Sequence, residues 1–308
     1  MTMNYLKKFL PVLILALCCL AAVSARAESE GVVRYGVSQT ALQNDFVDGY
    51  GDNGYLPVRL TGYQESDGDT RYFTRWVQNT QGKNWIVRSN RTQAEFNNFF
   101  VAYKNQGYTL VDFSAYQTTN GVRFAGVWHN NTGIANHVAY PAATLAEMQT
   151  LHDTIGQNGW IPYRIEAYTV GGQSRFASVW YYQPGVARIW HSKMTQAQYQ
   201  DKLNDYSDQG YKPIHIHSHT QGGTVYFSAI WKQTNQSMWV RTNREAKVFQ
   251  RYYNNYWADG YSIDNFYAAL TPNGVRFGGI WYFDGVPQVN DNSSLSLKVR
   301  KEVDGAPA

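Results

Sequence analysis

The stretch GYTLVDFSAYQTTNGVRFAGVW, residues 107–128, carries the pattern that decides the fold, because the chain repeats it five times. Each copy begins with a Gly-aromatic pair and ends in a Trp 21 or 22 residues later, and successive copies start 50 to 53 residues apart. The landmarks are Gly54, Gly107, Gly159, Gly210 and Gly260, followed by Trp76, Trp128, Trp180, Trp231 and Trp281. A fixed period of this length predicts tandem units that bury a continuous core against one another.

Each copy combines a helical period with two strands. Before the Gly of residue 107, Phe96, Phe99, Phe100 and Tyr103 form one apolar helical stripe, and Thr92 stands at an N-cap position, as Thr144 and Thr195 do in later copies. After the Gly the period is two, with a hairpin turn at Asn120-Gly121. A third strand is expected after most Trp residues, at 85–88, 137–140, 188–191 and 238–241. We therefore predict an α+β tandem repeat of five α-β-β-β units.

Two arrangements of the units are open. Residues 32–37 look like a strand with no partner in the first copy, while the third strand expected in the last copy, residues 286–289, contains Pro287, which cannot donate to a ladder. The N-terminal strand would then complete the last unit and close a propeller-like ring, which is the favoured arrangement. The alternative is an open, curved solenoid with capped ends.

The first 27 residues are typical of a cleavable signal peptide. Lys7 and Lys8 precede an apolar segment, residues 9–23, and Ala25-Arg26-Ala27 matches a cleavage site. We expect residues 28–290 to form the repeat domain and residues 291–308 a tail, in a periplasmic or secreted protein with no membrane span after cleavage. Both cysteines, Cys18 and Cys19, fall in the apolar segment.

The charge of the chain gives no reason to expect a nucleic-acid partner. The formal net charge is +4 over 308 residues, and without Lys7, Lys8 and Arg26 it falls to 24 basic against 23 acidic residues. A balance of this kind lacks the basic surface that polynucleotides need.

The sequence contains no familiar catalytic motif, and no catalytic residue or cofactor is predicted. The most pointed local feature is His215-Ile216-His217-Ser218-His219, whose alternate imidazoles share one strand face. His215 and His217 are candidates for a metal site, but no carboxylate is adjacent in the sequence. Polar histidines on a strand face are the favoured interpretation.

The same strand positions differ in chemistry from copy to copy, whereas the alternate face stays mostly apolar or small. In repeat proteins this contrast is typical of a solvent-exposed binding surface. The predicted ligand-binding residues are Arg59, Thr61, Tyr63, Asp112, Ser114, Tyr116, Arg164, Glu166, Tyr168, His215, His217, His219, Asn265 and Tyr267.

The motifs Gly-Tyr-x-Pro at 54–57 and 210–213 and Arg-Phe-Ala-Gly-Val-Trp at 123–128 resemble the bacterial tandem repeat found before serine β-lactamase-type hydrolase domains and in fungal polyglycine hydrolases. The resemblance covers roughly residues 31–290. It implies a non-catalytic repeat region that accompanies a serine hydrolase and helps to hold a polypeptide or cell-wall substrate. The nucleophile motif of such hydrolases is absent, and the tail resembles at most the start of a hydrolase domain.

The leading hypothesis is an exported, non-catalytic protein that binds an extended peptide or glycan, of cell-wall or host origin, on the polar and aromatic strand face. The alternative is a truncated or partner-dependent hydrolase, acting with a separate serine hydrolase chain or using His215, His217 or His219 with Glu166 or Asp112.

Overall fold

The computed structural model describes residues 31–44 and 49–284 of the chain. The predicted signal peptide, the predicted strand at 286–289 and the predicted tail therefore lie outside the described residues. No helix in the described ranges has the length and apolar character needed to cross a membrane.

The described chain folds into five units that share one order of elements: strand, helix, then a hairpin of two long strands. The units are β1 (Gly31–Val37), α2 (Gln39–Asn44), β2 (Tyr55–Gln64) and β3 (Thr70–Gln78); β4 (Trp85–Arg91), α3 (Gln93–Asn105), β5 (Thr109–Thr118) and β6 (Gly121–His129); β7 (His137–Ala143), α4 (Leu145–Thr154), a 3₁₀ turn at Gly156–Asn158, β8 (Trp160–Val170) and β9 (Gln173–Tyr182); β10 (Ile189–Met194), α5 (Gln196–Asp208), β11 (Tyr211–Gln221) and β12 (Thr224–Gln233); and β13 (Met238–Arg244), α6 (Ala246–Ala258), β14 (Tyr261–Thr271) and β15 (Gly274–Phe283).

Each unit is a three-stranded antiparallel sheet whose middle strand comes last in the chain, as in the order β4-β6-β5. The tandem α+β prediction is confirmed, but the predicted order within the unit is wrong, because the strand that follows each Trp pairs with the next hairpin. The prediction that the N-terminal strand completes the last unit is also wrong. β1 pairs with β3 of its own unit, with Val33 opposite Arg75, and β13 holds the corresponding place in the fifth sheet.

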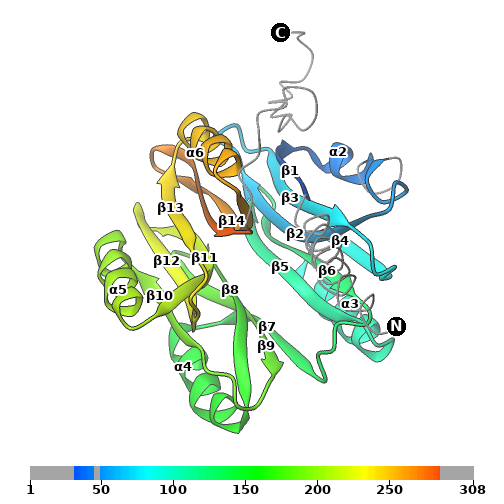
Figure 1. Cartoon of the computed structure of the whole chain (residues 1–308), viewed down its shortest axis with the longest axis horizontal. Helices are drawn as coiled ribbons and strands as arrows, with labels where there is room; N and C mark the ends of the chain where they lie inside the picture. The colour runs from blue at the N-terminus through cyan, green and yellow to red at the C-terminus, as the bar shows by residue number, and fades with distance from the viewer. Residues whose placement is uncertain (1–30, 45–48, 285–308) are drawn as a thin grey trace, which may run out of the picture.

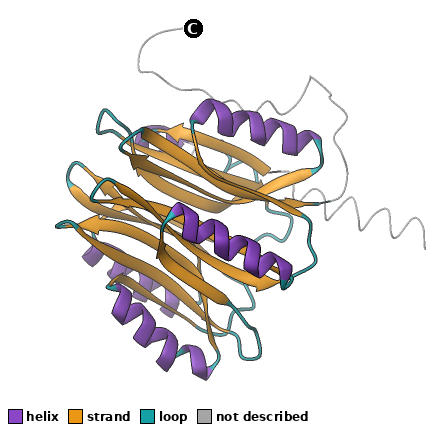
Figure 2. Cartoon of the chain, turned by 90° about the vertical axis from the view of Figure 1, so that its left-hand side faces the viewer, coloured by secondary structure: helices purple, strands orange, loops and turns teal. Residues whose placement is uncertain are grey.

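The units form a closed circle without sharing a sheet. The inner strands β2, β5, β8, β11 and β14 each contact the next around a central axis, and β14 contacts β2 (Figure 1). Phe73 of the first unit stacks on Phe266 of the fifth with centroids 3.6 Å apart. The helices lie on the periphery of the strand layers (Figure 2).

The repeated residues build one core per unit. All five landmark Trp side chains are completely buried, and the helical stripe packs on them, as Phe96 does on Trp128 with centroids 5.7 Å apart. The predicted N-caps Thr92, Thr144 and Thr195 are confirmed, each within a capping box. A Cβ at Gly126 would lie 2.6 Å from the Trp128 side chain, so the small residue in this strand makes room for the indole.

Candidate functional site: an axial cavity above a buried charge network

The inner strands pose a problem of backbone hydrogen bonding. Each is the edge strand of its own sheet, yet its free edge is buried against the next unit. Buried N–H and C=O groups require partners, and here side chains of the neighbouring unit supply them. Asp112 accepts from the Leu60 N–H at 2.7 Å, His217 Nδ1 from the Ala167 N–H at 3.2 Å, and Asn265 from the Ile216 N–H at 2.8 Å.

This arrangement corrects the expectation of an exposed binding face. Of the residues predicted to bind ligand, all but Arg59 are buried: Thr61, Tyr63, Asp112, Ser114, Tyr116, Arg164, Glu166, Tyr168, His215, His217, His219, Asn265 and Tyr267. They do converge, but in the interior between units. The side chains at these positions differ from copy to copy, and so do the backbone groups and side chains that they contact in the neighbouring unit.

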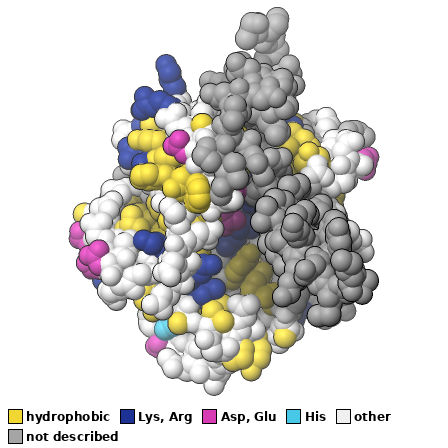
Figure 3. Space-filling model, viewed as in Figure 1, with side chains coloured by type: hydrophobic (Ala, Val, Ile, Leu, Met, Phe, Trp, Pro, Cys, Tyr) yellow, Lys and Arg dark blue, Asp and Glu magenta, His cyan; other side chains and the backbone are white. Residues whose placement is uncertain are grey.

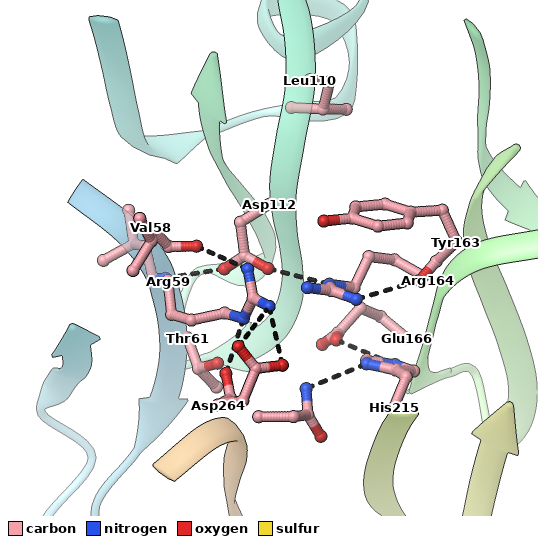
Figure 4. A network of polar contacts seen from close by, with 12 residues as sticks. Val58, Arg59, Thr61, Leu110, Asp112, Tyr163, Arg164, Glu166, His215 and Asp264 are labelled. Atoms are coloured by element: carbon pink, nitrogen blue, oxygen red, sulfur yellow. Dashed lines mark hydrogen bonds and ion pairs between the residues drawn. The ribbon is translucent and has the colours of Figure 1, made fainter. Parts of the chain in front are cut away.

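Ion pairs between Arg and Asp side chains occupy the middle of the circle, and Figure 4 shows two of them. Arg164 Nε lies 3.0 Å from Asp112 Oδ1, and Arg59 Nη2 lies 3.1 Å from Asp264 Oδ2. Burial alone would raise the pKa of Asp264, but the guanidinium groups of Arg59 and Arg75 outweigh it and hold the pKa at about 2. Each pair joins two different units, and the Arg59 pair joins the first unit to the fifth.

Sequence reasoning missed Asp264 and Arg75 as members of this network. Asp264 occupies the position held by Val58, Val111, Tyr163 and Ile214 in the other copies, on the strand face that alternation predicts to be mostly apolar. The strand contains an irregularity between Ile263 and Asn265, which takes Asp264 out of the regular register. The signal available was a carboxylate at an otherwise apolar position of the repeat, which calls for a buried cation.

His215 and His217 each contact a neighbouring group through both ring nitrogens. His215 Nε2 donates to the Ile165 carbonyl at 2.9 Å, and its Nδ1 accepts from the Asn265 amide at 3.1 Å. His217 Nδ1 accepts from the Ala167 N–H, so the ring proton is on Nε2, which lies 3.0 Å from Glu166 Oε2. No group of three metal-ligating side chains occurs within residues 31–44 and 49–284.

Burial also sets the protonation of this cluster. It lowers the pKa of His217 to about 3, with a smaller effect from His219, and it raises the pKa of Glu166, with Asp112 adding to the shift. Because the Nδ1 lone pair accepts from the Ala167 N–H and Nε2 carries the proton, neutral His217 has no free lone pair with which to accept a proton from a serine. The arrangement is that of a structural hydrogen-bond network, and it gives no support to the hydrolase built on His217 and Glu166.

We expect the stability of the protein to decrease as the pH falls from about 6.5 to about 4. Burial lowers the pKa of His129, His137 and His219 to about 4, so the unfolded chain takes up protons first. Their contribution is complete above the unfolded pKa and is lost as the pH falls. Glu166, with its raised pKa, acts in the opposite direction. Urea midpoints across this interval test the slope, which His129→Gln should flatten; a pH-independent midpoint would contradict the burial of these imidazoles.

Above the network, where the inner strands approach their hairpins, the axis widens into a cavity of about 170 Å³. The space exists because each unit contributes one small residue to the lining: Gly62, Ala115, Ala167, Ser218 and Ala268. The following residues of the same strands stand at the mouth: Gln64, Gln117, Thr169, Thr220 and Leu270. Of the residues predicted to bind ligand, five line the cavity: Tyr63, Tyr116, Tyr168, His217 and His219.

The lining contains no Lys, Arg, Asp or Glu side chain. Its two imidazoles are neutral at physiological pH, because burial lowers the pKa of His217 to about 3 and of His219 to about 4. The mouth carries amide, hydroxyl and aliphatic groups, and Thr169 and Thr220 already donate to carbonyls of the neighbouring unit. The cavity is therefore suited to a neutral group that forms hydrogen bonds.

The fold and its axial cavity define a circular tandem-repeat protein. The family described as polyglycine hydrolase-like, structural repeat, matches residues 29–79, 82–131, 138–183 and 185–234, and the chain belongs to this family. These boundaries coincide with the strand-helix-hairpin units seen in the structure, to which residues 238–283 add a fifth. No curated protein matches the chain.

Proposed function

We propose that this chain is a non-catalytic binding module that holds a neutral side chain or sugar of an extended peptide or glycan in its axial cavity. The observation that carries the proposal is the uncharged lining at a place where all five units meet. A peptide amide or a sugar hydroxyl can exchange hydrogen bonds with such groups, whereas a charged ligand would lose its hydration without gaining a counter-charge.

The size of the cavity favours one small group over a whole ligand. Pockets for drug-sized molecules occupy roughly 300–1,000 Å³, and this cavity is about 170 Å³. An extended polymer would therefore insert one side chain or one sugar and lie across the mouth. The exposed Gln117 and half-buried Gln64 offer amides to the rest of such a chain.

The proposal includes export of the chain and work alongside a hydrolase. Residues 1–27 support export through their signal-peptide pattern. The association of this repeat family with polyglycine hydrolase-like proteins supports a role in holding a polymer for a hydrolytic partner.

Binding of neutral oligopeptides and neutral oligosaccharides to the chain tests this function. We expect Gln117→Trp, which places an indole at the mouth from an exposed strand position, to weaken binding by about tenfold or more. Val101→Trp, at an exposed position of α3, is the matched control and should bind as the unsubstituted chain does. Equal binding by both variants, or retention of no neutral probe at all, would argue against the cavity as the site.

A further inference from the structure

The fifth unit carries a cluster of arginines around one aromatic ring. The guanidinium carbons of Arg241, Arg244 and Arg251 lie 4.7, 5.9 and 6.0 Å from the centre of the Tyr252 ring. We call these residues, with Trp239 and Lys247, the basic-aromatic patch. Figure 3 shows Lys and Arg side chains gathered beside apolar ones in the region where Figure 1 places α6 and β13.

The patch lacks counter-charges of its own. Within the described ranges, no ion pair is formed by Arg241, Arg244 or Arg251. The neighbouring Glu245 is directed to Arg276, at 3.4 Å. Clustered like charges repel one another, so the approach of an anion lowers the free energy of the patch.

The second unit shows the same framework with one of its arginines paired to a carboxylate. Arg91 and Arg244 are equivalent, since each pairs with the corresponding Phe of its middle strand, Phe124 or Phe277. Arg91 forms an i,i+4 ion pair with Glu95, at 3.9 Å. Four residues after Arg244 the fifth unit has Val248, so this carboxylate is missing.

Two other replacements at equivalent positions add positive charge. Lys247 stands where the second unit has Ala94, and Arg251 where it has Asn98. The capping box is lost as well, because Glu245 replaces Thr92 at the N-cap and Val248 replaces Glu95 at the third helical position, and α6 has no side-chain N-cap hydrogen bond. The fifth unit therefore has two more cations in this segment and the same number of carboxylates, but its carboxylate, Glu245, is directed to Arg276, and the helix gives up a stabilising contact.

An exposed flat aromatic surface lies beside these cations. Trp239 is 41% exposed, and it stacks on Tyr256 with centroids 5.2 Å apart and planes 3° from parallel. The equivalent strand residue of the second unit is Ile86, opposite Trp128 as Trp239 is opposite Trp281. An aromatic side chain held flat in this way presents a rigid surface to a ligand.

We propose that the basic-aromatic patch binds an acidic oligosaccharide, with a uronate sugar packed against Trp239 and its carboxylates paired with Arg244 and Arg251. Guanidinium groups form bidentate contacts with carboxylates, and the aromatic face contacts the apolar face of the sugar. A short acidic glycan needs only the few cations present here. A polynucleotide needs a broader basic surface than a chain with 27 basic and 23 acidic residues offers.

Oligogalacturonate and its neutral methyl ester are matched probes for this site. We expect the acid to bind the chain and the ester to bind at least about tenfold more weakly, with the difference shrinking as salt rises from about 0.05 M to about 0.5 M. Equal binding of acid and ester would overturn the proposal. So would equal or tighter binding of polyglutamate or of a single-stranded oligonucleotide, which would point to another class of partner.

Val248→Glu is the decisive variant, because it restores to Arg244 the carboxylate that Arg91 has in Glu95. We expect it to weaken oligogalacturonate binding by roughly threefold to tenfold while the unfolding midpoint stays the same or rises, since an acidic residue in the first helical turn is favourable. Trp239→Ala should weaken binding as well. Arg91→Gln is the matched control in the second unit and should leave it unchanged. Unaltered binding by Val248→Glu would overturn the proposal, and Gln117→Trp separates this site from the axial cavity.

Discussion

Asp112→Ala is expected to destabilise the protein by about 3–5 kcal/mol, because it leaves Arg164 charged in the interior. The side chains of Asp112 and Arg164 are only 5% and 3% exposed, and their Oδ1–Nε distance is 3.0 Å. The same substitution removes the acceptor of the Leu60 N–H on the free edge of β2. Two buried groups would lose their partner at once, and chemical denaturation with urea should report the loss as a lower midpoint.

A double substitution separates the charge from the packing. Asp112→Leu combined with Arg164→Leu removes both charges and should recover a large part of the lost stability, since buried ion pairs replaced by apolar residues are often neutral. The matched control is Arg91→Gln, which breaks the half-exposed pair with Glu95, leaves the capping box of α3 in place and should cost less than about 1 kcal/mol. If Asp112→Ala were as mild as Arg91→Gln, the buried network would not contribute to holding the units together.

The sequence was informative about the repeat because each landmark has a local physical cause. Gly107 has a φ of 82° at the end of its helix, Thr92 caps the helix, and Trp128 anchors the core. The pairing of strands has no such local signature. A strand between a Trp and a helix can join the hairpin before it or the one after it, and the periodicity is the same in both cases, so the phase of the unit could not be determined.

The candidate site was only partly predictable for a related reason. Alternation separates the two faces of a strand, but it does not reveal whether the polar face meets water or another unit. His217 and Glu166 are polar and also buried, because the edge backbone of the preceding unit needs hydrogen bonds. The axial cavity had one readable sign: Gly62, Ala115, Ala167, Ser218 and Ala268 are small at the same position of every copy.

The closure of the circle depends on a residue that departs from the repeat. Phe73 stands where the other copies have Ala125, Ala177, Ser228 and Gly278, as their pairing with the inner strands shows. The small residues let adjacent units approach, whereas Phe73 reaches into the core of the fifth unit. There it contacts Phe249, Phe266 and Phe277, and it is completely buried.

Phe73→Ala is therefore expected to cost about 3–5 kcal/mol, the usual loss for a buried Phe, and to open the contact between the first and fifth units. In an open array each unit depends only on its neighbours in sequence, so damage to β3 would stay in the first unit. In a closed circle, amides of β2 and β14 should lose hydrogen-exchange protection together. Phe113→Ala in the second unit is the control of similar size and burial, and it should leave β14 protected. Unchanged protection in β14 after Phe73→Ala would mean that the ion pair of Arg59 with Asp264 closes the circle without the aromatic stack.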